Sequence, residues 1–309
     1  MSKRFSVRLH VVAILYFSAS AAQAMVGGTP APDRLLNVAT TAVKVGGEWT
    51  WYGCTGTMIS PRVFATVAHC NLTPPQFLAQ WYPQLAGMDH WEAGITFSPD
   101  VQQTDYFNPL PPEAKVYPAK VVIYPGWSWD DALGLLFDGS PSGFVDTSEE
   151  VDVAVYLLDE PVPGVHPAKL VEEGFFDRNP RSLRTWTFGF AGYGMGTREA
   201  CDGNATPDFG VRRYAPVRYE RTYRAKVDLR GDRACAEDSG GPVFLVDNDD
   251  RRIPRYVETL AGTLQDDPTS SQSGLDDVFN RLDTPKAQRF LRRFLRDDGT
   301  ARGAAFTKE

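Results

Sequence analysis

Short apolar runs separated by turn residues are the feature that most constrains the fold of this chain. Gly, Pro, Asn and Asp interrupt the sequence at short intervals, and it contains no internal repeat or low-complexity tract. Several runs are apolar throughout, as expected where one strand face fills a barrel and the other packs against a neighbour. The pattern therefore predicts an all-β protein. Its clearest predicted strands are 57–67, 120–124, 151–158, 185–190, 243–246 and 256–264.

One segment near the C-terminus has helical periodicity instead. Thr284 can cap a helix, and Pro285 suits its first position, where no backbone N–H is needed. We expect a helix over 284–296 and a frayed tail over 297–309. Apolar residues recur along one face of this helix: Ala287, Phe290, Leu291, Phe294 and Leu295.

The first 24 residues are typical of a secretory signal. Lys3, Arg4 and Arg8 precede a mostly apolar stretch, and Ala-Gln-Ala at 22–24 has the small-x-small pattern that signal peptidase recognises. The apolar run is too short to span a bilayer, which needs about 20 residues. We predict a cleaved signal peptide over 1–24 and a secreted or periplasmic protein.

Charge and cysteine content narrow the class of protein. Removing the signal takes away three basic and no acidic residues, so the formal net charge moves from −7 to about −10. Such a surface argues against nucleic acid or an anionic membrane as a partner. Four cysteines in an exported chain favour two disulfides, with three possible connectivities. No Cys-x-x-Cys is present, and the only histidines after the signal are His69, His90 and His166, so no metal site is indicated.

Three residues far apart in the chain could form a nucleophilic catalytic site. Ser239 lies in Asp-Ser-Gly-Gly-Pro, His69 in Ala-Thr-Val-Ala-His-Cys, and Asp152 in Val-Asp-Val-Ala-Val. A serine hydroxyl needs an imidazole to take its proton, and the imidazole needs a carboxylate to orient it. Asp152 interrupts an apolar strand, where an unpaired acid is costly, although Ser-Gly-Gly-Pro alone is also ordinary turn chemistry. Other carboxylates for the same role are Asp130, Asp131 and Asp159.

At these residues the chain resembles the trypsin/chymotrypsin family of serine peptidases, which carries the triad in the order His, Asp, Ser. The resemblance covers roughly residues 25–296. Further matches are Gly-Cys-Thr-Gly-Thr-Met-Ile-Ser at 53–60, Gly-Tyr-Gly at 192–194, and Val-Phe-Asn-Arg-Leu at 278–282 followed by a helix.

The resemblance implies two antiparallel six-stranded β-barrels with a C-terminal α-helix and the active site between the barrels. The first barrel is expected over about 36–170 and the second over about 180–282. The family's disulfide around the catalytic histidine implies the pair Cys54–Cys70, which leaves Cys201–Cys235. Between His69 and Asp152 lie 82 residues, more than is typical of the family, and we expect surface loops around 73–118 and 127–150.

The resemblance also implies the roles of the site residues. Ser239 would attack a peptide carbonyl, with His69 as general base and then general acid and Asp152 orienting His69. The N–H groups of Glu237 and Ser239 would hold the oxyanion. No metal or organic cofactor is implied, the expected partner is a protein or peptide substrate, and we expect a monomer.

Two positions depart from the family pattern near this expected site. Glu237 stands where the family has glycine, and its side chain restricts the backbone and brings a carboxylate near the developing negative charge. Gln265 falls where the family usually has a serine that supports the triad aspartate.

Two further assignments follow from the resemblance. Met25-Val-Gly-Gly matches the family's mature N-terminus, so the Met25 ammonium is expected to pair with Asp238. Arg233 is expected at the floor of the specificity pocket, with Asp277 as a candidate partner on its wall. If the two pair, the pocket should favour small or apolar side chains; if they do not, Arg233 either attracts an acidic side chain or turns out to solvent. In each case substrates with Lys or Arg before the cut should be poor.

The sequence therefore leaves two candidate functions. The first is an exported serine endopeptidase acting through an acyl-enzyme. The second is a catalytically weak or inactive homologue that uses the same fold as a binding module, which Glu237 favours and the complete triad disfavours.

Overall fold

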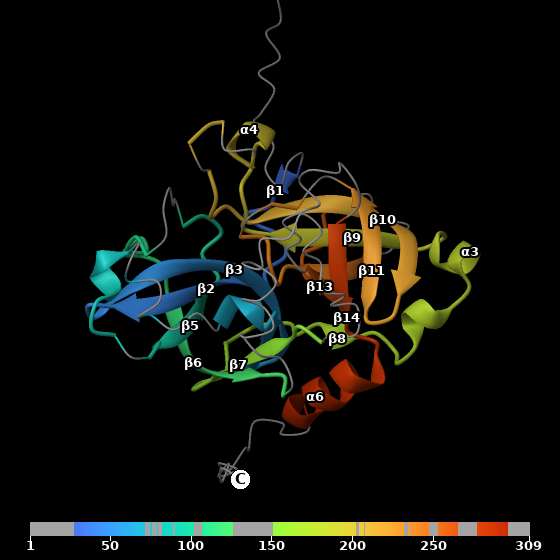
Figure 1. Ribbon diagram of the computed structural model, residues 1–309, viewed down its shortest axis with the longest axis horizontal. Coiled ribbons are helices and arrows are strands. Elements are labelled where there is room, and N and C mark those ends of the chain that lie inside the picture. Colours follow the sequence, from blue (N-terminus) through green and yellow to red (C-terminus); the bar gives the residue numbers. More distant parts are fainter. Residues whose placement is uncertain are drawn as a thin grey trace, which may run out of the picture.

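The apolar runs form two closed antiparallel β-barrels with a C-terminal helix in the computed structural model of this chain (Figure 1). The predicted fold class, all-β with two six-stranded barrels of the trypsin-like kind and a C-terminal helix, is confirmed. The structure describes residues 28–71, 75, 79, 82–88, 90–101, 107–125, 151–201, 204–206, 208–231, 234–235, 237–246, 253–264 and 277–295.

The first barrel is closed in the strand order β2-β3-β4-β7-β6-β5. Val45 pairs with Glu48 across a two-residue turn, and Gly46 and Gly47 have φ of +59° and +92°. Such a turn suits glycine and sets the register of the β2–β3 hairpin. The strands are β2 (Val38–Val45), β3 (Glu48–Ser60), β4 (Val63–Thr66), β5 (Ala93–Thr96), β6 (Val116–Ile123) and β7 (Ala154–Leu158).

The predicted strand 57–67 was wrong, because this segment forms two strands. β3 ends at Ser60 and β4 begins at Val63, and the two strands pair antiparallel. Pro61 lies in the turn between them, where its fixed φ and missing N–H are tolerated. An apolar run on both sides of this turn concealed the reversal of the chain.

The second barrel is closed because β9 pairs with both β10 and β12. Alternate residues of β10, among them Ala215, Val217 and Tyr219, enter the apolar interior. The strands are β9 (Thr187–Gly192), β10 (Arg213–Tyr223), β11 (Lys226–Gly231), β12 (Pro242–Val246), β13 (Thr259–Leu264) and β14 (Asp277–Arg281), and β1 (Thr29–Pro30) and β8 (Lys169–Leu170) extend the sheet at β10 and β13.

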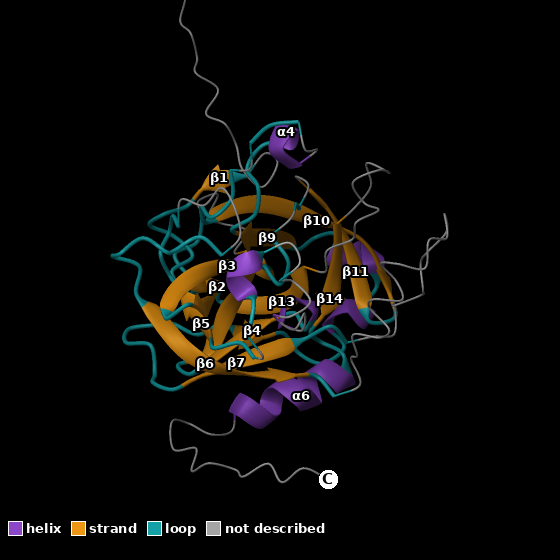
Figure 2. Cartoon of the chain, turned by 60° about the vertical axis from the view of Figure 1, so that its left-hand side comes forward, coloured by secondary structure: helices purple, strands orange, loops and turns teal. Residues whose placement is uncertain are grey.

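Figure 2 shows α4 (Arg198–Cys201) at the top of the molecule and α6 (Pro285–Leu295) at the bottom. Phe290 and Leu291 of α6 (Pro285–Leu295) are buried in the apolar cluster that also contains Val155 of the first barrel and Phe244 of the second. Burial of each such side chain stabilises the fold by roughly 1.5 to 3 kcal/mol. The helix therefore packs against residues of both barrels. Among the described residues, α3 (Pro180–Leu183) and α4 (Arg198–Cys201) are further short α-helices.

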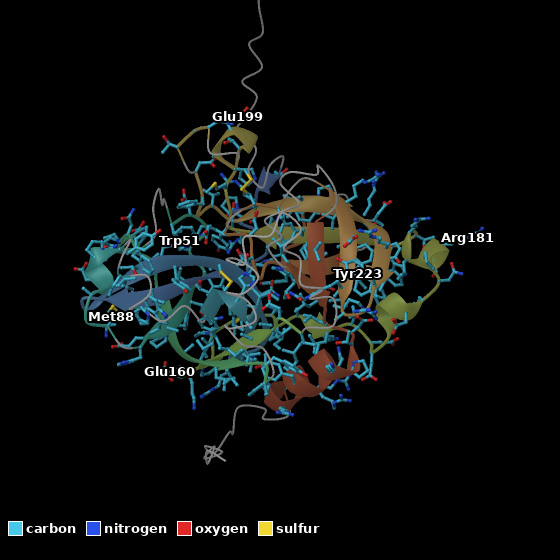
Figure 3. The ribbon with its side chains drawn as sticks, viewed as in Figure 1. Trp51, Met88, Glu160, Arg181, Glu199 and Tyr223 are labelled. Carbon is cyan, nitrogen blue, oxygen red and sulfur yellow. A yellow bond between two sulfur atoms is a disulfide. The ribbon has the colours of Figure 1, made fainter. Side chains whose placement is uncertain are left out.

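Two disulfides and a buried arginine add cross-links. The cysteines pair as Cys54–Cys70, which the resemblance implies, and as Cys201–Cys235, the pair that remains, and both appear as yellow bonds in Figure 3. Arg212 is 1% exposed between the barrels. Its guanidinium donates to the carbonyls of Ala31, Pro32, Val38 and Phe97 and to the hydroxyl of Tyr193.

Candidate active site

His69 lies three residues after the end of β4, in a short turn that is fixed from two sides. A 3₁₀ turn runs from His69 to Asn71, and Cys70 within it is bonded to Cys54 on β3. The Asn71 side chain donates a hydrogen bond of 3.1 Å to the Val67 carbonyl. The disulfide and this hydrogen bond hold the backbone of the turn. The His69 side chain is 27% exposed, so a substrate can reach the imidazole.

Asp152 is the carboxylate that orients this imidazole. Its Oδ2 lies 2.6 Å from His69 Nδ1, and its Oδ1 accepts the backbone N–H groups of Ala68 (2.7 Å) and His69 (3.0 Å). Because an ionised carboxylate only accepts, Nδ1 carries the imidazole proton and Nε2 can act as a base. Burial raises the pKa of the Asp152 carboxyl, but the charge and hydrogen bonds of His69 and the charge of Lys226 hold it below its ordinary value.

The competing carboxylates do not replace Asp152 in the described part of the chain. Asp159 lies just beyond the other end of β7, where its N–H donates to the Pro118 carbonyl and its carbonyl accepts from Arg62. Asp130 and Asp131 lie outside the described residues. Among these carboxylates, the one hydrogen-bonded to His69 in the described residues is therefore Asp152, which interrupts the apolar run.

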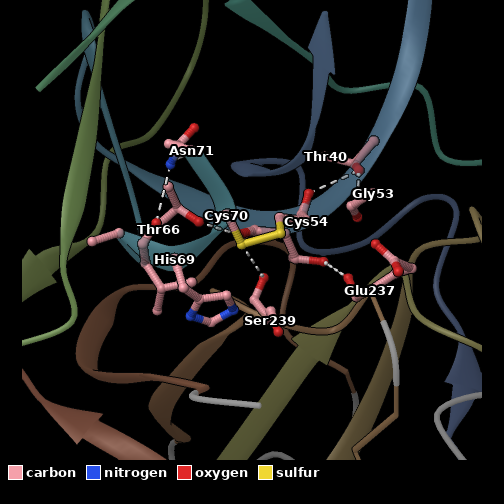
Figure 4. Close-up of a disulfide and its surroundings, with 12 residues drawn as sticks. Thr40, Gly53, Cys54, Thr66, His69, Cys70, Asn71, Glu237 and Ser239 are labelled. Carbon is pink, nitrogen blue, oxygen red and sulfur yellow. Dashed lines mark hydrogen bonds between the residues drawn. A yellow bond between two sulfur atoms is a disulfide. The ribbon is translucent and has the colours of Figure 1, made fainter. Parts of the chain in front are cut away.

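Ser239 lies in the turn before β12, against the disulfide that brackets His69. Its carbonyl accepts the Thr55 N–H at 2.8 Å and lies 3.9 Å from Cys70 Sγ. Figure 4 shows the imidazole of His69 extending toward Ser239 on one side of this disulfide. Gly240 has φ +80°, and a Cβ there would lie 2.3 Å from the Thr55 carbonyl oxygen. The Ser-Gly sequence therefore allows the turn that contains Ser239 to approach β3 closely.

Asp238 holds the same turn from its buried side. The carboxylate is fully buried, with Oδ1 accepting the Gly194 N–H (2.8 Å) and Oδ2 the Cys235 N–H (3.1 Å). A Cβ on Gly192 would lie 1.9 Å from Oδ1, so the Gly-Tyr-Gly segment leaves room for the carboxylate. Met25, its predicted partner, lies outside the described residues, and that ion pair stays a prediction.

Glu237 has a backbone conformation that favours glycine. Its φ is +77°, and its carbonyl accepts a hydrogen bond of 3.1 Å from Thr55 Oγ1. A left-handed conformation costs an L-residue roughly 1 to 2 kcal/mol. Burial raises the pKa of the Tyr52 phenol, and the negative charge of Glu237 raises it further. The charge of the carboxylate thus acts on a side chain of β3.

Thr55 and Lys226 are residues of this region that the sequence did not indicate. Besides its bonds to Ser239 and Glu237, Thr55 accepts the Tyr193 N–H at its hydroxyl (3.0 Å). Lys226 is 1% exposed and acts electrostatically on Asp152. A threonine in a strand and a lysine in an alternating run carry no sequence signal for such contacts.

The predicted specificity pocket and several loops fall largely outside the described part of the chain. Arg233, Gln265 and the segment 127–150 are among these residues. Asp277 begins β14 opposite Leu229, but its side chain is not among those described. The pocket assignment stays a prediction.

The described residues contain neither a cluster of metal-ligating side chains nor a helix that could span a membrane. No group of three or more His, Cys, Asp or Glu side chains there is suited to hold a metal ion. No helix in the described ranges is long and apolar enough to cross a membrane.

Comparison with known proteins does not identify a family. A scan against protein-family models and a search of curated proteins both return no match for this chain.

Proposed function

We propose that this chain is an exported serine endopeptidase of the trypsin/chymotrypsin type. The observation that carries the proposal is the orientation of His69: the buried Asp152 carboxylate accepts Nδ1 at 2.6 Å and the backbone N–H groups of residues 68 and 69. This arrangement leaves Nε2 unprotonated on the edge of the imidazole that substrate can reach. The two disulfides support an exported protein, because disulfides persist in oxidising compartments.

The proposed reaction is acyl transfer. His69 Nε2 takes the proton of the Ser239 hydroxyl as Oγ attacks the scissile carbonyl, and His69 then gives the proton to the leaving amine. Asp152 stabilises the imidazolium that forms in between. Water, activated by the same imidazole, hydrolyses the acyl-enzyme and restores Ser239. The backbone N–H groups of Glu237 and Ser239 are the proposed donors to the oxyanion.

A fluorophosphonate probe tests this proposal directly. The mature wild-type protein should take up one probe per chain, and intact mass should locate the adduct on Ser239. Ser239→Ala should take up none, His69→Ala should react at least a hundredfold more slowly, and the control Ser182→Ala, on the exposed helix α3, should react as wild type. A folded wild-type protein without an adduct would refute the enzyme.

The alternative is a binding module that retains the fold. Its specific support is Glu237, whose strained backbone and charge lie at the proposed oxyanion donor. This candidate predicts a folded protein that does not react with the probe and whose affinity for its partner is unchanged in Ser239→Ala. The same labelling experiment therefore separates the two functions.

A further inference from the structure

A row of buried polar side chains crosses the second barrel beside the proposed site. Lys226 on β11 pairs directly with Asn280 on β14, and Asn280 pairs directly with Thr263 on β13. Residues directly opposite one another in a sheet place their side chains on the same face. Lys226 and Asn280 are each 1% exposed and Thr263 is 0% exposed, so this polar row is inside the protein.

The polar row lies on the outer face of the second barrel. Val227 and Phe279, which follow Lys226 and precede Asn280 along their strands, belong to the apolar cluster in the barrel interior. Successive side chains of a strand point to opposite faces. Lys226 and Asn280 therefore point away from that interior, toward what packs on the barrel from outside.

The ammonium of Lys226 is held in a defined position within this row. Its Nζ donates to Asn280 Oδ1 at 2.6 Å. Within the described residues, Asn280 Nδ2 and Thr263 Oγ1 are buried without a hydrogen-bond partner. A buried ammonium and two such orphaned groups are costly for folding alone. Such a cost to folding is typical of a functional site.

The segment that contains Asp152 packs on this outer face: Val151 and Val153, which flank Asp152, share an apolar cluster with Phe244 of β12. Phe244 pairs with Leu260 on β13, and Pro242, two residues before Phe244, pairs with Thr263 of the polar row. Asp152 is therefore a first-barrel carboxylate on which the Lys226 ammonium can act. The charged groups that act on the buried Asp152 carboxylate, among the described residues, are His69 from the 3₁₀ turn and Lys226 from β11. Both charges stabilise the ionised carboxylate and so oppose the effect of burial, which favours the protonated form. An ionised Asp152 is what the imidazole requires, because a protonated carboxyl could no longer stabilise the imidazolium.

We propose that Lys226 is a positioning residue for the catalytic pair: its buried ammonium, oriented by Asn280, stabilises the Asp152 carboxylate from the second barrel while His69 contacts it from the first. The role in catalysis rests on the proposed peptidase function, whereas the electrostatic coupling does not. The positive charge of Lys226 opposes protonation of the His69–Asp152 pair. Removing the charge should therefore make the pair hold its proton to higher pH.

The experiment is an NMR titration of the His69 imidazole in the full mature chain, with its signals assigned by their loss in His69→Gln. Lys226→Met removes the charge and Lys226→Gln removes it while keeping a donor for Asn280. Both should raise the pH midpoint of His69 by about one pH unit. Lys226→Arg keeps the charge, and Lys169→Met removes an exposed lysine on β8, so both should titrate as wild type.

The outcomes separate the coupling from the function. A rise of about half a pH unit or more in a folded neutral variant supports the proposal, and a smaller change in both refutes it. Should neither neutral variant fold, Asn280→Asp places a carboxylate beside Nζ and must raise the midpoint, and an unchanged midpoint refutes the proposal. In an active enzyme, the acid limb of kcat/KM must move with the midpoint. If wild type fails to react with a fluorophosphonate, the peptidase is refuted while the titration still tests the coupling.

Discussion

Glycine at position 237 should both stabilise the protein and raise its turnover. Glu237 has φ +77°, a conformation that costs an L-residue roughly 1 to 2 kcal/mol and glycine almost nothing. Glycine loses more conformational freedom on folding, which offsets roughly 0.5 to 1 kcal/mol. We therefore expect Glu237→Gly to raise the free energy of unfolding by about 0.5 to 1 kcal/mol.

The effect on turnover has a separate cause, because Glu237 also carries a charge beside the proposed oxyanion. Relieving this repulsion should increase turnover of a small ester about tenfold, which corresponds to roughly 1.4 kcal/mol in the transition state. Glu237→Gln removes the charge but keeps the side chain and its backbone strain. This variant should therefore gain most of the turnover and none of the stability.

Arg224→Gly is the matched control for backbone strain. Arg224 also has a positive φ, +47°, and it lies in the turn between β10 and β11. Its carbonyl, which accepts from Arg281 Nη1, is retained in glycine. This variant should gain stability in urea unfolding without any change in ester turnover.

Two results would refute the reasoning about Glu237. If Glu237→Gly is no more stable than wild type while Arg224→Gly is, then strain at 237 is not what its φ implies. If Glu237→Gly is well folded and turns over the ester no faster than wild type, the oxyanion site is built around the glutamate.

Four further outcomes are expected. Arg212→Met should lower the free energy of unfolding in urea by about 3 kcal/mol, because buried carbonyls lose their donor. Replacing Cys201 and Cys235 together by alanine should cost about 3 to 4 kcal/mol in the same assay, since the bond closes a loop of 34 residues. The pKa of the Asp152 carboxyl is lower in the folded protein than its ordinary value of 3.8. The ionised carboxylate therefore stabilises the fold above pH 3.8, and this stabilisation is lost as the pH falls through the folded-state pKa. Acid unfolding of Asp152→Asn should show a shallower dependence on pH in this range. A peptide-library profile should show little cleavage after Lys or Arg, and a profile dominated by them would overturn the assignment of Arg233.

The barrel strands could be predicted where apolar runs mark them, and could not where the pattern is mixed. Residues 243–246 form most of β12 as expected. β10 (Arg213–Tyr223) was not among the clearest predictions, because its exposed face carries charged residues and only every second side chain is buried. The extra strand in 57–67 was missed since both halves are apolar and a single turn separates them. Local composition indicates burial, whereas chain reversal depends on one or two turn residues.

The site could be predicted in its residue types and order, but not in what supports it. His69 and Asp152 are indicated by the chemistry that each requires of the other, and the structure gives their hydrogen bonds directly. Lys226 and Thr55 could not be found in this way. Their importance depends on which strands of the two barrels meet, and that information is spread over pairings more than 100 residues apart in sequence.

The geometry of the proposed site is a property of the interface between the barrels. His69 and Asp152 belong to the first barrel and Ser239 to the second, so no single barrel contains the three groups. Thr55 of the first barrel is hydrogen-bonded to the second barrel. Its N–H donates to the Ser239 carbonyl, and its hydroxyl accepts from the Tyr193 N–H and donates to the Glu237 carbonyl. A shift of one barrel against the other would break these bonds before it separated the apolar faces, because hydrogen bonds weaken steeply with distance and angle. The same interface that stabilises the fold therefore sets the distance between the proposed base and its nucleophile.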